Sequence, residues 1–137
     1  VVVWLRDPVQ RMVSRHEHYL RDVEAGRPLQ RVHGLRPGLD LAAFIEIPRF
    51  HNSCAKYLRG FPRERIACFG FSEDMAEGLA RMRNRLGLDL GPAVRENANP
   101  SNAGRGYEIP PAIERRIIAL NREDLRLWHW AREREGA

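Results

Sequence analysis

The hydrophobic pattern changes type within the first ten residues of the chain. Residues 1–5 form an unbroken apolar run that begins with three valines, typical of a short strand covered on both faces in a parallel sheet. Asp7 follows as a candidate N-cap, and Pro8 suits the first helical position, where no N–H is needed. Gln10 stands three residues after the cap, the spacing of a capping box. The pattern therefore predicts a strand that passes directly into a helix beginning at Pro8.

Beyond Pro8 the apolar residues recur at helical spacing, so this helix is expected to have one face against a core. The expected core positions are Val9, Met12, Val13, Leu20 and Val23. The opposite, polar stripe comprises Asp7, Gln10, Arg11, Ser14 and His18. Residues 25–40 then carry three Gly and two Pro with little periodicity, which predicts a long loop.

The middle of the chain predicts two short helices and a second strand. Residues 41–47 are expected to form a helix capped by Asp40, and residues 49–59 another helix. Residues 65–71 are a second apolar run, which we interpret as a buried strand.

Two helical regions follow the second strand. The first is opened by Ser72 and ended by Gly87, and the second covers residues 110–135 with a joint at Asn121. The first is expected to bury Met75, Leu79, Met82 and Leu86. The second is expected to turn Ile113, Ile117, Ile118 and Leu120 toward the core.

These elements predict a helix-rich α/β fold with a short parallel sheet flanked by helices. Residues 1–5 and 66–70 are expected to be neighbouring parallel strands, with the helix from Pro8 packed on one face of the sheet. The length of 137 residues fits a single domain. Two cysteines, Cys54 and Cys68, cannot form a disulfide framework and lack paired metal-ligand spacing, so both are expected to be reduced thiols.

The charge of the chain limits the classes of molecule that it is expected to bind. The net charge is +5, from 23 basic against 18 acidic residues, and every basic residue except Lys56 is Arg. The arginines are interleaved with acidic residues, so we interpret them as a solvated surface and expect no nucleic-acid partner. A positive potential also fits an anionic nucleotide or an acidic or sulfated acceptor. No apolar run reaches 18 residues, so we expect no membrane segment. We expect a cytoplasmic location, or a Golgi-type lumenal one if the protein is eukaryotic.

Candidate chemistry is concentrated where the first strand meets the first helix. Arg6 leaves the carboxyl end of the strand, a position where α/β sheets bind ligands, and it lies beside a helix N-terminus, which attracts anions. Ser14 adds a hydroxyl on the polar stripe. Alternatively, Arg6 pairs with Asp7 or another nearby carboxylate, and Ser14 is a neutral surface residue.

The residues from Arg6 to Arg11, followed by Ser14, resemble the 3′-phosphate-binding strand and helix of sulfotransferases that use 3′-phosphoadenosine 5′-phosphosulfate (PAPS). The amino-acid sequence of this motif is similar to that of the carbohydrate and bacterial branch of the family. Weaker resemblances lie in residues 50–60, in residues 69–73 and in the spacing of Asn121 and Asp124 before Leu127 and Trp128. Together they span nearly the whole chain but only the carboxyl-terminal half of the family fold.

The resemblance implies a partial P-loop-type, three-layer sulfotransferase fold. It implies that Arg6 and Ser14 hold the 3′-phosphate of PAPS or of its product, 3′,5′-adenosine bisphosphate. Residues 91–108 are loosely similar to the loop that covers the nucleotide, which makes Ser101 and Arg105 further candidate cofactor ligands. The family's Arg-Lys-Gly signature is absent there, and a flexible surface loop is the alternative.

The reaction implied is transfer of a sulfuryl group from PAPS to a hydroxyl or amine acceptor, with a carbohydrate among the candidates, and it requires no metal. The chain has neither a lysine-containing phosphosulfate loop nor a P-loop motif. We therefore expect those parts and the catalytic base upstream of Val1, and we expect this chain alone to be inactive.

The arginines and the histidine of residues 25–40 are candidate acceptor contacts, or else part of an ordinary exposed connection. Two other functions stay open: a non-catalytic nucleotide- or phosphate-binding module, and a P-loop kinase fragment.

Overall fold

A two-stranded parallel sheet stands at the centre of the computed structural model, which describes residues 1–91 and 106–137. Strand β1 (Val2–Leu5) pairs with β2 (Cys68–Phe71) in a register that places Val2 opposite Cys68 and Leu5 opposite Phe71. The predicted parallel pairing of these two segments is confirmed, as is the helix-rich α/β character.

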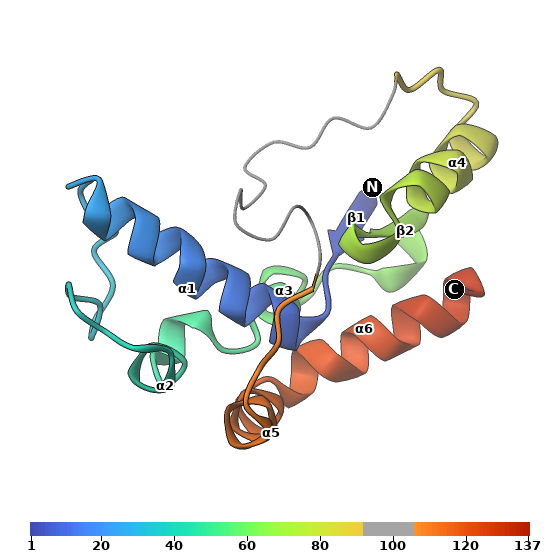
Figure 1. Ribbon diagram of the computed structural model, residues 1–137. Coiled ribbons are helices and arrows are strands. Elements are labelled where there is room, and N and C mark those ends of the chain that lie inside the picture. The colour runs from blue at the N-terminus through green and yellow to red at the C-terminus, as the bar shows by residue number, and fades with distance from the viewer. Residues whose placement is uncertain (92–105) are drawn as a thin grey trace.

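Six α-helices and three short 3-10 helices make up most of the described remainder (Figure 1). Asp7 and Asp40 cap the helices that were predicted to follow them, and Gly87 ends its helix with a φ of 63°. The joint at Asn121 is also confirmed. The α-helices are α1 (Pro8–Glu24), α2 (Leu41–Phe44), α3 (Ser53–Tyr57), α4 (Met75–Leu86), α5 (Pro111–Leu120) and α6 (Arg122–Glu135), and the 3-10 helices are η1 (Pro48–Phe50), η2 (Arg63–Arg65) and η3 (Ser72–Asp74).

Three predicted elements are shorter than expected. The helix over residues 41–47 ends at Phe44, and the strand over residues 65–71 begins only at Cys68, after η2. The helix over residues 49–59 is split into η1 and α3, because Asn52 adopts a left-handed conformation with a φ of 49°. Asparagine tolerates this conformation better than most residues.

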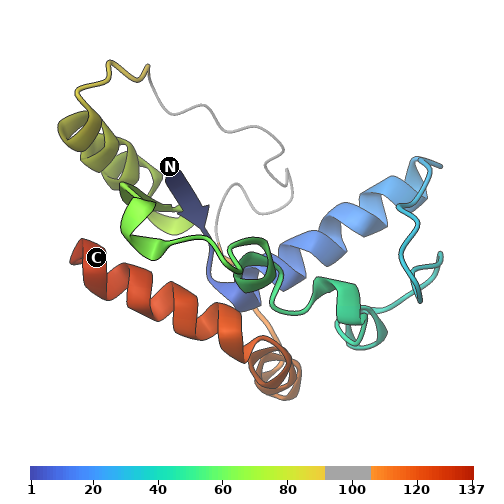
Figure 2. The ribbon, with the colours of Figure 1, turned by 180° about the vertical axis from the view of Figure 1, so that it is seen from behind.

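The helices cover the sheet in an arrangement that differs from the prediction. Helices α4 and α6 lie on opposite sides of the strand pair, whereas α1 extends away from it (Figures 1 and 2). The expectation that α1 packs on a face of the sheet is therefore wrong. Its core face belongs to a separate apolar cluster with α2 and α5, while the sheet shares its cluster with α6. The junction between β1 and α1 therefore lies at the boundary between the two apolar clusters.

Strand β1 and three of the helices, α1, α4 and α5, bury fewer residues than the periodicity indicated. Strand β2 is fully buried, whereas Val2, Val3 and Trp4 of β1 are half-buried and only Leu5 is buried. Leu20, Leu86 and Ile118 were expected in the core and are 37–40% exposed. On α1 the additional core positions are His16 and Tyr19, whose polar atoms bond backbone groups of the following loop.

Trp4 explains how α4 approaches the sheet. A Cβ added at Gly70 of β2 would lie 2.5 Å from the Trp4 ring, and one added at Gly78 of α4 would lie 2.7 Å from it. The indole therefore occupies the space that side chains at both glycines would need. Met75, Leu79 and Met82 flank this contact and are only half-buried. Among the described residues, no helix is both long and apolar enough to span a membrane.

Candidate functional site

The carboxyl ends of the two strands meet at the start of α1. The Asp7 carboxylate accepts hydrogen bonds from the backbone N–H groups of Val9 and Gln10, at 2.8 and 3.0 Å, and so caps the helix. The backbone N–H of Asp7 itself donates to Oε1 of Glu73, 2.6 Å away, from the segment that follows β2. Glu73 therefore holds the β1–α1 junction against the end of the second strand.

Arg6 lies at this junction, between the end of β1 and the start of α1. Its guanidinium carbon is 6.0 Å from the centre of the Tyr107 ring. Within the described part of the chain no group accepts a hydrogen bond from the Arg6 side chain, and no carboxylate forms an ion pair with it. Asp7 serves the helix cap instead, so the alternative of an Arg6–Asp7 pair is not what the structure contains.

Gln10 connects the junction to the segment that leads into α5. Its side-chain amide donates to the carbonyl of Tyr107 at 3.2 Å, and its Oε1 accepts from the N–H of Tyr107 at 2.8 Å. Gly106 is close enough that an added Cβ would lie 3.5 Å from the Gln10 oxygen. Sequence reasoning treated Gln10 as part of a capping signal and missed this pairing. The position of Gln10 on the polar stripe of α1 was the available signal.

Ser14 lies one helical turn after Gln10 on the same side of α1. Residues four apart on a helix have Cβ atoms about 5–6 Å apart, so Ser14 adjoins the surface that Gln10 and Tyr107 form. Its side chain is half-buried, and its hydroxyl has no hydrogen-bond partner among the described residues. Arg6 and Ser14 are thus linked along one surface through Tyr107 and Gln10.

The other predicted ligands are not part of this surface in the described structure. Ser101 and Arg105 lie outside the described residues, although Gly106, the next residue along the chain, lies beside Gln10. Residues 25–40 follow the far end of α1, a helix about 25 Å long at 1.5 Å per residue. Arg27, one of the candidate acceptor contacts in that loop, pairs with Asp22 at 3.0 Å, at the end of α1 that is remote from Arg6.

Arg11 faces a different part of the molecule from Arg6, although both belong to the motif. Its guanidinium pairs with the buried carboxylate of Asp124 on α6 and donates to Sγ of Cys54 at 2.7 Å. Arg11 therefore joins α1 to α3 and α6, a structural role that sequence reasoning did not assign. The charge of Arg11 also acts on its neighbour Arg15, whose pKa is lowered from its usual value first by burial and then by this charge.

Comparison with known proteins does not identify the family of this chain. The chain matches no known protein family, no curated protein and no solved structure. Its function is therefore inferred from the surface around Arg6 and from the resemblance of the strand and helix that carry it.

Proposed function

We propose that this chain supplies the 3′-phosphate-binding part of a sulfotransferase that uses PAPS. The observation that carries this proposal is the Arg6 guanidinium, which stands at the carboxyl end of β1, directly before α1, without an anionic partner among the described residues. An arginine in this position is suited to a phosphate, because its planar fork can donate two parallel hydrogen bonds to phosphate oxygens.

The helix N-terminus by itself offers less to an anion than the sequence indicated. Two of its N–H groups, those of Val9 and Gln10, already donate to the Asp7 carboxylate, whose negative charge offsets the positive end of the helix dipole. The attraction for a phosphate must therefore come chiefly from Arg6. In this proposal Ser14 adds one neutral hydrogen bond, and the Tyr107 ring limits the directions in which the guanidinium can point.

The bound PAPS would supply the activated sulfuryl group for transfer to a hydroxyl or amine acceptor, with a carbohydrate among the candidates. Arg6 and Ser14 hold and orient the nucleotide through its 3′-phosphate and do not take part in the transfer itself. Correct positioning of this kind contributes to rate by presenting the reacting groups at the right distance and angle. The net charge of +5 further favours a multiply anionic nucleotide.

Calorimetric titration with three nucleotides tests the proposal. We expect 3′,5′-adenosine bisphosphate to bind at least tenfold more tightly than adenosine 5′-monophosphate, which differs only in lacking the 3′-phosphate. Equal affinity for the two would refute a 3′-phosphate site. Tighter binding of adenosine 5′-triphosphate than of the bisphosphate would instead support the kinase alternative.

A further inference from the structure

A strongly basic pocket lies where α1 and the loop that follows it meet the segment formed by η1 and α3, which runs beside α1 in Figures 1 and 2. Its volume is about 410 Å³, within the range of about 300–1,000 Å³ typical of small-molecule sites. Three of the residues that line it are cationic, Arg15, Arg49 and Lys56, and all the others are uncharged. The lining therefore carries three positive charges and no negative one.

Two of these cations are held against η1, the short helix to which the third belongs. Nζ of Lys56 donates to the carbonyl oxygen of Pro48 at 3.2 Å, and the guanidinium carbon of Arg15 lies 4.8 Å from the centre of the Phe50 ring. Pro48 and Phe50 are the first and last residues of η1, in which the rise is about 2 Å per residue, and Arg49 lies between them. The three positive charges are thus gathered around one turn of the chain.

No carboxylate in the described part of the chain is paired with these cations. None of the three forms an ion pair with a described residue. The Asp124 carboxylate acts on Arg15 electrostatically, but it is already paired with Arg11. Arg15 is half-buried, and its pKa is lowered first by burial and then by the charge of Arg11. A charge partly withdrawn from water is unfavourable without a partner, so a bound anion would stabilise Arg15.

The pocket also offers one aromatic surface. The Phe50 ring is already covered by the Arg15 guanidinium and by the Phe44 ring, whose centroid is 5.0 Å away. Tyr57, by contrast, lines the pocket with a side chain that is 89% exposed. A flat organic group can therefore lie against Tyr57.

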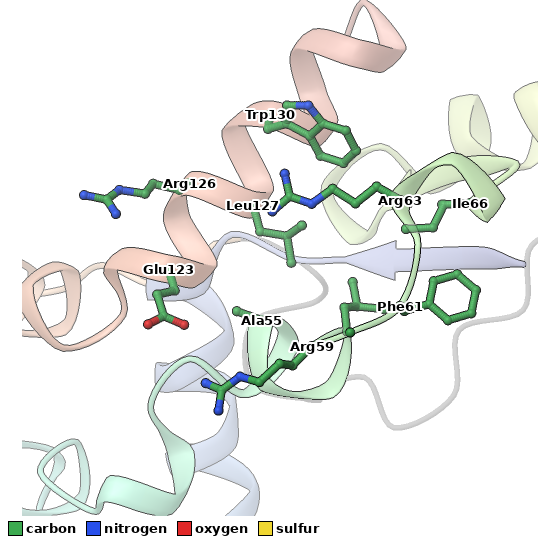
Figure 3. Close-up of a pocket in the computed structure, with 11 residues that line it drawn as sticks. Ala55, Arg59, Phe61, Arg63, Ile66, Glu123, Arg126, Leu127 and Trp130 are labelled. Atoms are coloured by element: carbon green, nitrogen blue, oxygen red, sulfur yellow. The ribbon is translucent and has the colours of Figure 1, made fainter.

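This pocket is separate from the two other surfaces near it. Lys56 and Tyr57 line it from α3, whereas Ala55 of the same helix lines a different pocket, shown in Figure 3, which also includes the carboxylate of Glu123. The residues around the proposed 3′-phosphate site, Arg6 among them, do not line it.

From this arrangement we infer that the pocket binds a small aryl phosphate, with the dianionic phosphate among Arg15, Arg49 and Lys56 and the ring against Tyr57. Three cations attract a dianion more strongly than a monoanion, because the Coulomb energy is proportional to the charge of the ligand. The arginines present donors in a planar fork, and Lys56 has two donors left after its bond to η1. Phosphate oxygens can accept charge-assisted hydrogen bonds from all of these groups.

The charge requirement is tested by calorimetric titration with phenyl phosphate and with phenyl sulfate, which has a similar shape. At about pH 8 the phosphate is a dianion, since its second pKa is about 6, whereas the sulfate is a monoanion. We expect the phosphate to bind at least about tenfold more tightly, because it carries one further charge. The double variant Arg49→Gln, Lys56→Gln should lose this preference. The matched control is Arg59→Gln, Arg126→Gln, which removes two exposed arginines of the pocket in Figure 3 and should change neither affinity.

The contact with the ring is tested by Tyr57→Ser, which changes no charge. In the unaltered chain phenyl phosphate should bind more tightly than inorganic phosphate, and in this variant, with unchanged circular dichroism, the two should bind equally. Equal affinity for phenyl phosphate and phenyl sulfate would overturn the inference. It would also be overturned by unaltered phenyl phosphate binding in either pocket variant.

The two sites can fail independently in these experiments. Arg6→Ala should leave phenyl phosphate binding unchanged, and Arg49→Gln, Lys56→Gln should leave the affinity for 3′,5′-adenosine bisphosphate unchanged. Loss of phenyl phosphate binding in Arg6→Ala would place the phosphate at the Arg6 surface and overturn the inference of a separate site.

Discussion

Asn52 and Asp124 cap the N-termini of each other's helices. The side-chain oxygen of Asn52 accepts hydrogen bonds from the N–H groups of Glu123 and Asp124, at 3.0 and 3.2 Å, at the start of α6. In return the Asp124 carboxylate accepts from the N–H groups of Cys54 and Ala55, at 3.3 and 2.7 Å, at the start of α3. The two helices are thus fixed to each other at their ends, although the residues are 72 positions apart.

Asp124→Ala is expected to be strongly destabilising. The carboxylate is buried and satisfies both the first turn of α3 and the Arg11 guanidinium, so its removal leaves a charge and two N–H groups without partners. Breaking a buried ion pair from one side typically costs about 3–5 kcal/mol in the free energy of unfolding. Urea denaturation measures the loss. The neighbouring exposed substitution Glu123→Gln serves as control and should change stability by less than about 0.5 kcal/mol.

Arg6→Ala is expected to weaken binding of 3′,5′-adenosine bisphosphate without affecting folding. Hydrogen bonds to charged groups are worth about 1.5–3 kcal/mol each. Loss of two such bonds from a bidentate fork corresponds to at least about a hundredfold in affinity, since 1.4 kcal/mol is tenfold. Binding of adenosine 5′-phosphosulfate, which lacks the 3′-phosphate, should be unchanged. Calorimetry measures both, and wild-type affinity for the bisphosphate would assign Arg6 no part in phosphate binding.

Ser14→Ala is expected to have a smaller effect in the same titration, on the order of tenfold, because a hydroxyl contributes one hydrogen bond and no charge. Ser53→Ala is the matched control, since Ser53 is half-buried like Ser14 but belongs to α3 rather than to the surface around Arg6. A loss as large for Ser53→Ala as for Ser14→Ala would show that the effect is not specific to the proposed site.

Gly78→Ala is expected to destabilise the fold even though Ala is the better helix former. The new methyl group would lie 2.7 Å from the Trp4 ring and 3.3 Å from the Gly70 Cα, so α4 or the indole has to shift. Overpacking of this kind costs about 1–3 kcal/mol, which exceeds the roughly 1 kcal/mol gained in helix propensity. Thermal unfolding followed by Trp fluorescence measures the difference, and a stabilised variant would contradict the close packing of α4 on Trp4.

The Cys54 thiol is expected to resist ionisation. Burial raises its pKa above the usual value, although the nearby Arg11 charge acts in the opposite direction. In a Cys68→Ala variant, the rate of alkylation by iodoacetamide should therefore reach its midpoint above about pH 8.5, the ordinary pKa of a cysteine. A midpoint below that value would show that the Arg11 charge outweighs burial.

The same pKa shift fixes the sign of a stability change at high pH. Above the ordinary pKa the unfolded chain loses the Cys54 proton while the folded chain keeps it, so the unfolded state binds fewer protons. The contribution of this thiol to stability is complete below the ordinary pKa and declines as pH rises toward the folded pKa. Urea midpoints measured at increasing pH in the Cys68→Ala variant, compared with the Cys54→Ala, Cys68→Ala double variant, report this decline.

Local signals in the sequence were sufficient to predict the helices and strands and one long-range contact, the pairing of β1 with β2. Asp7 and Asp40 cap their helices as predicted, because a cap bonds N–H groups only two or three residues away. The two continuous apolar runs identified the parallel strand pair, since few other segments could be buried side by side. The same local reading placed Arg6 at the end of β1.

What lay beyond the sequence is the choice of partners between distant segments. Periodicity placed Leu20 and Ile118 in the core, but how far an apolar face is buried depends on which helices cover it, and both residues are exposed. Gln10 had the spacing of a capping box, yet the Asp7 N–H bonds Glu73 and the Gln10 amide bonds Tyr107. Spacing along the chain specifies which groups need a partner, whereas only the packed tertiary structure decides which distant residue comes close enough to provide it.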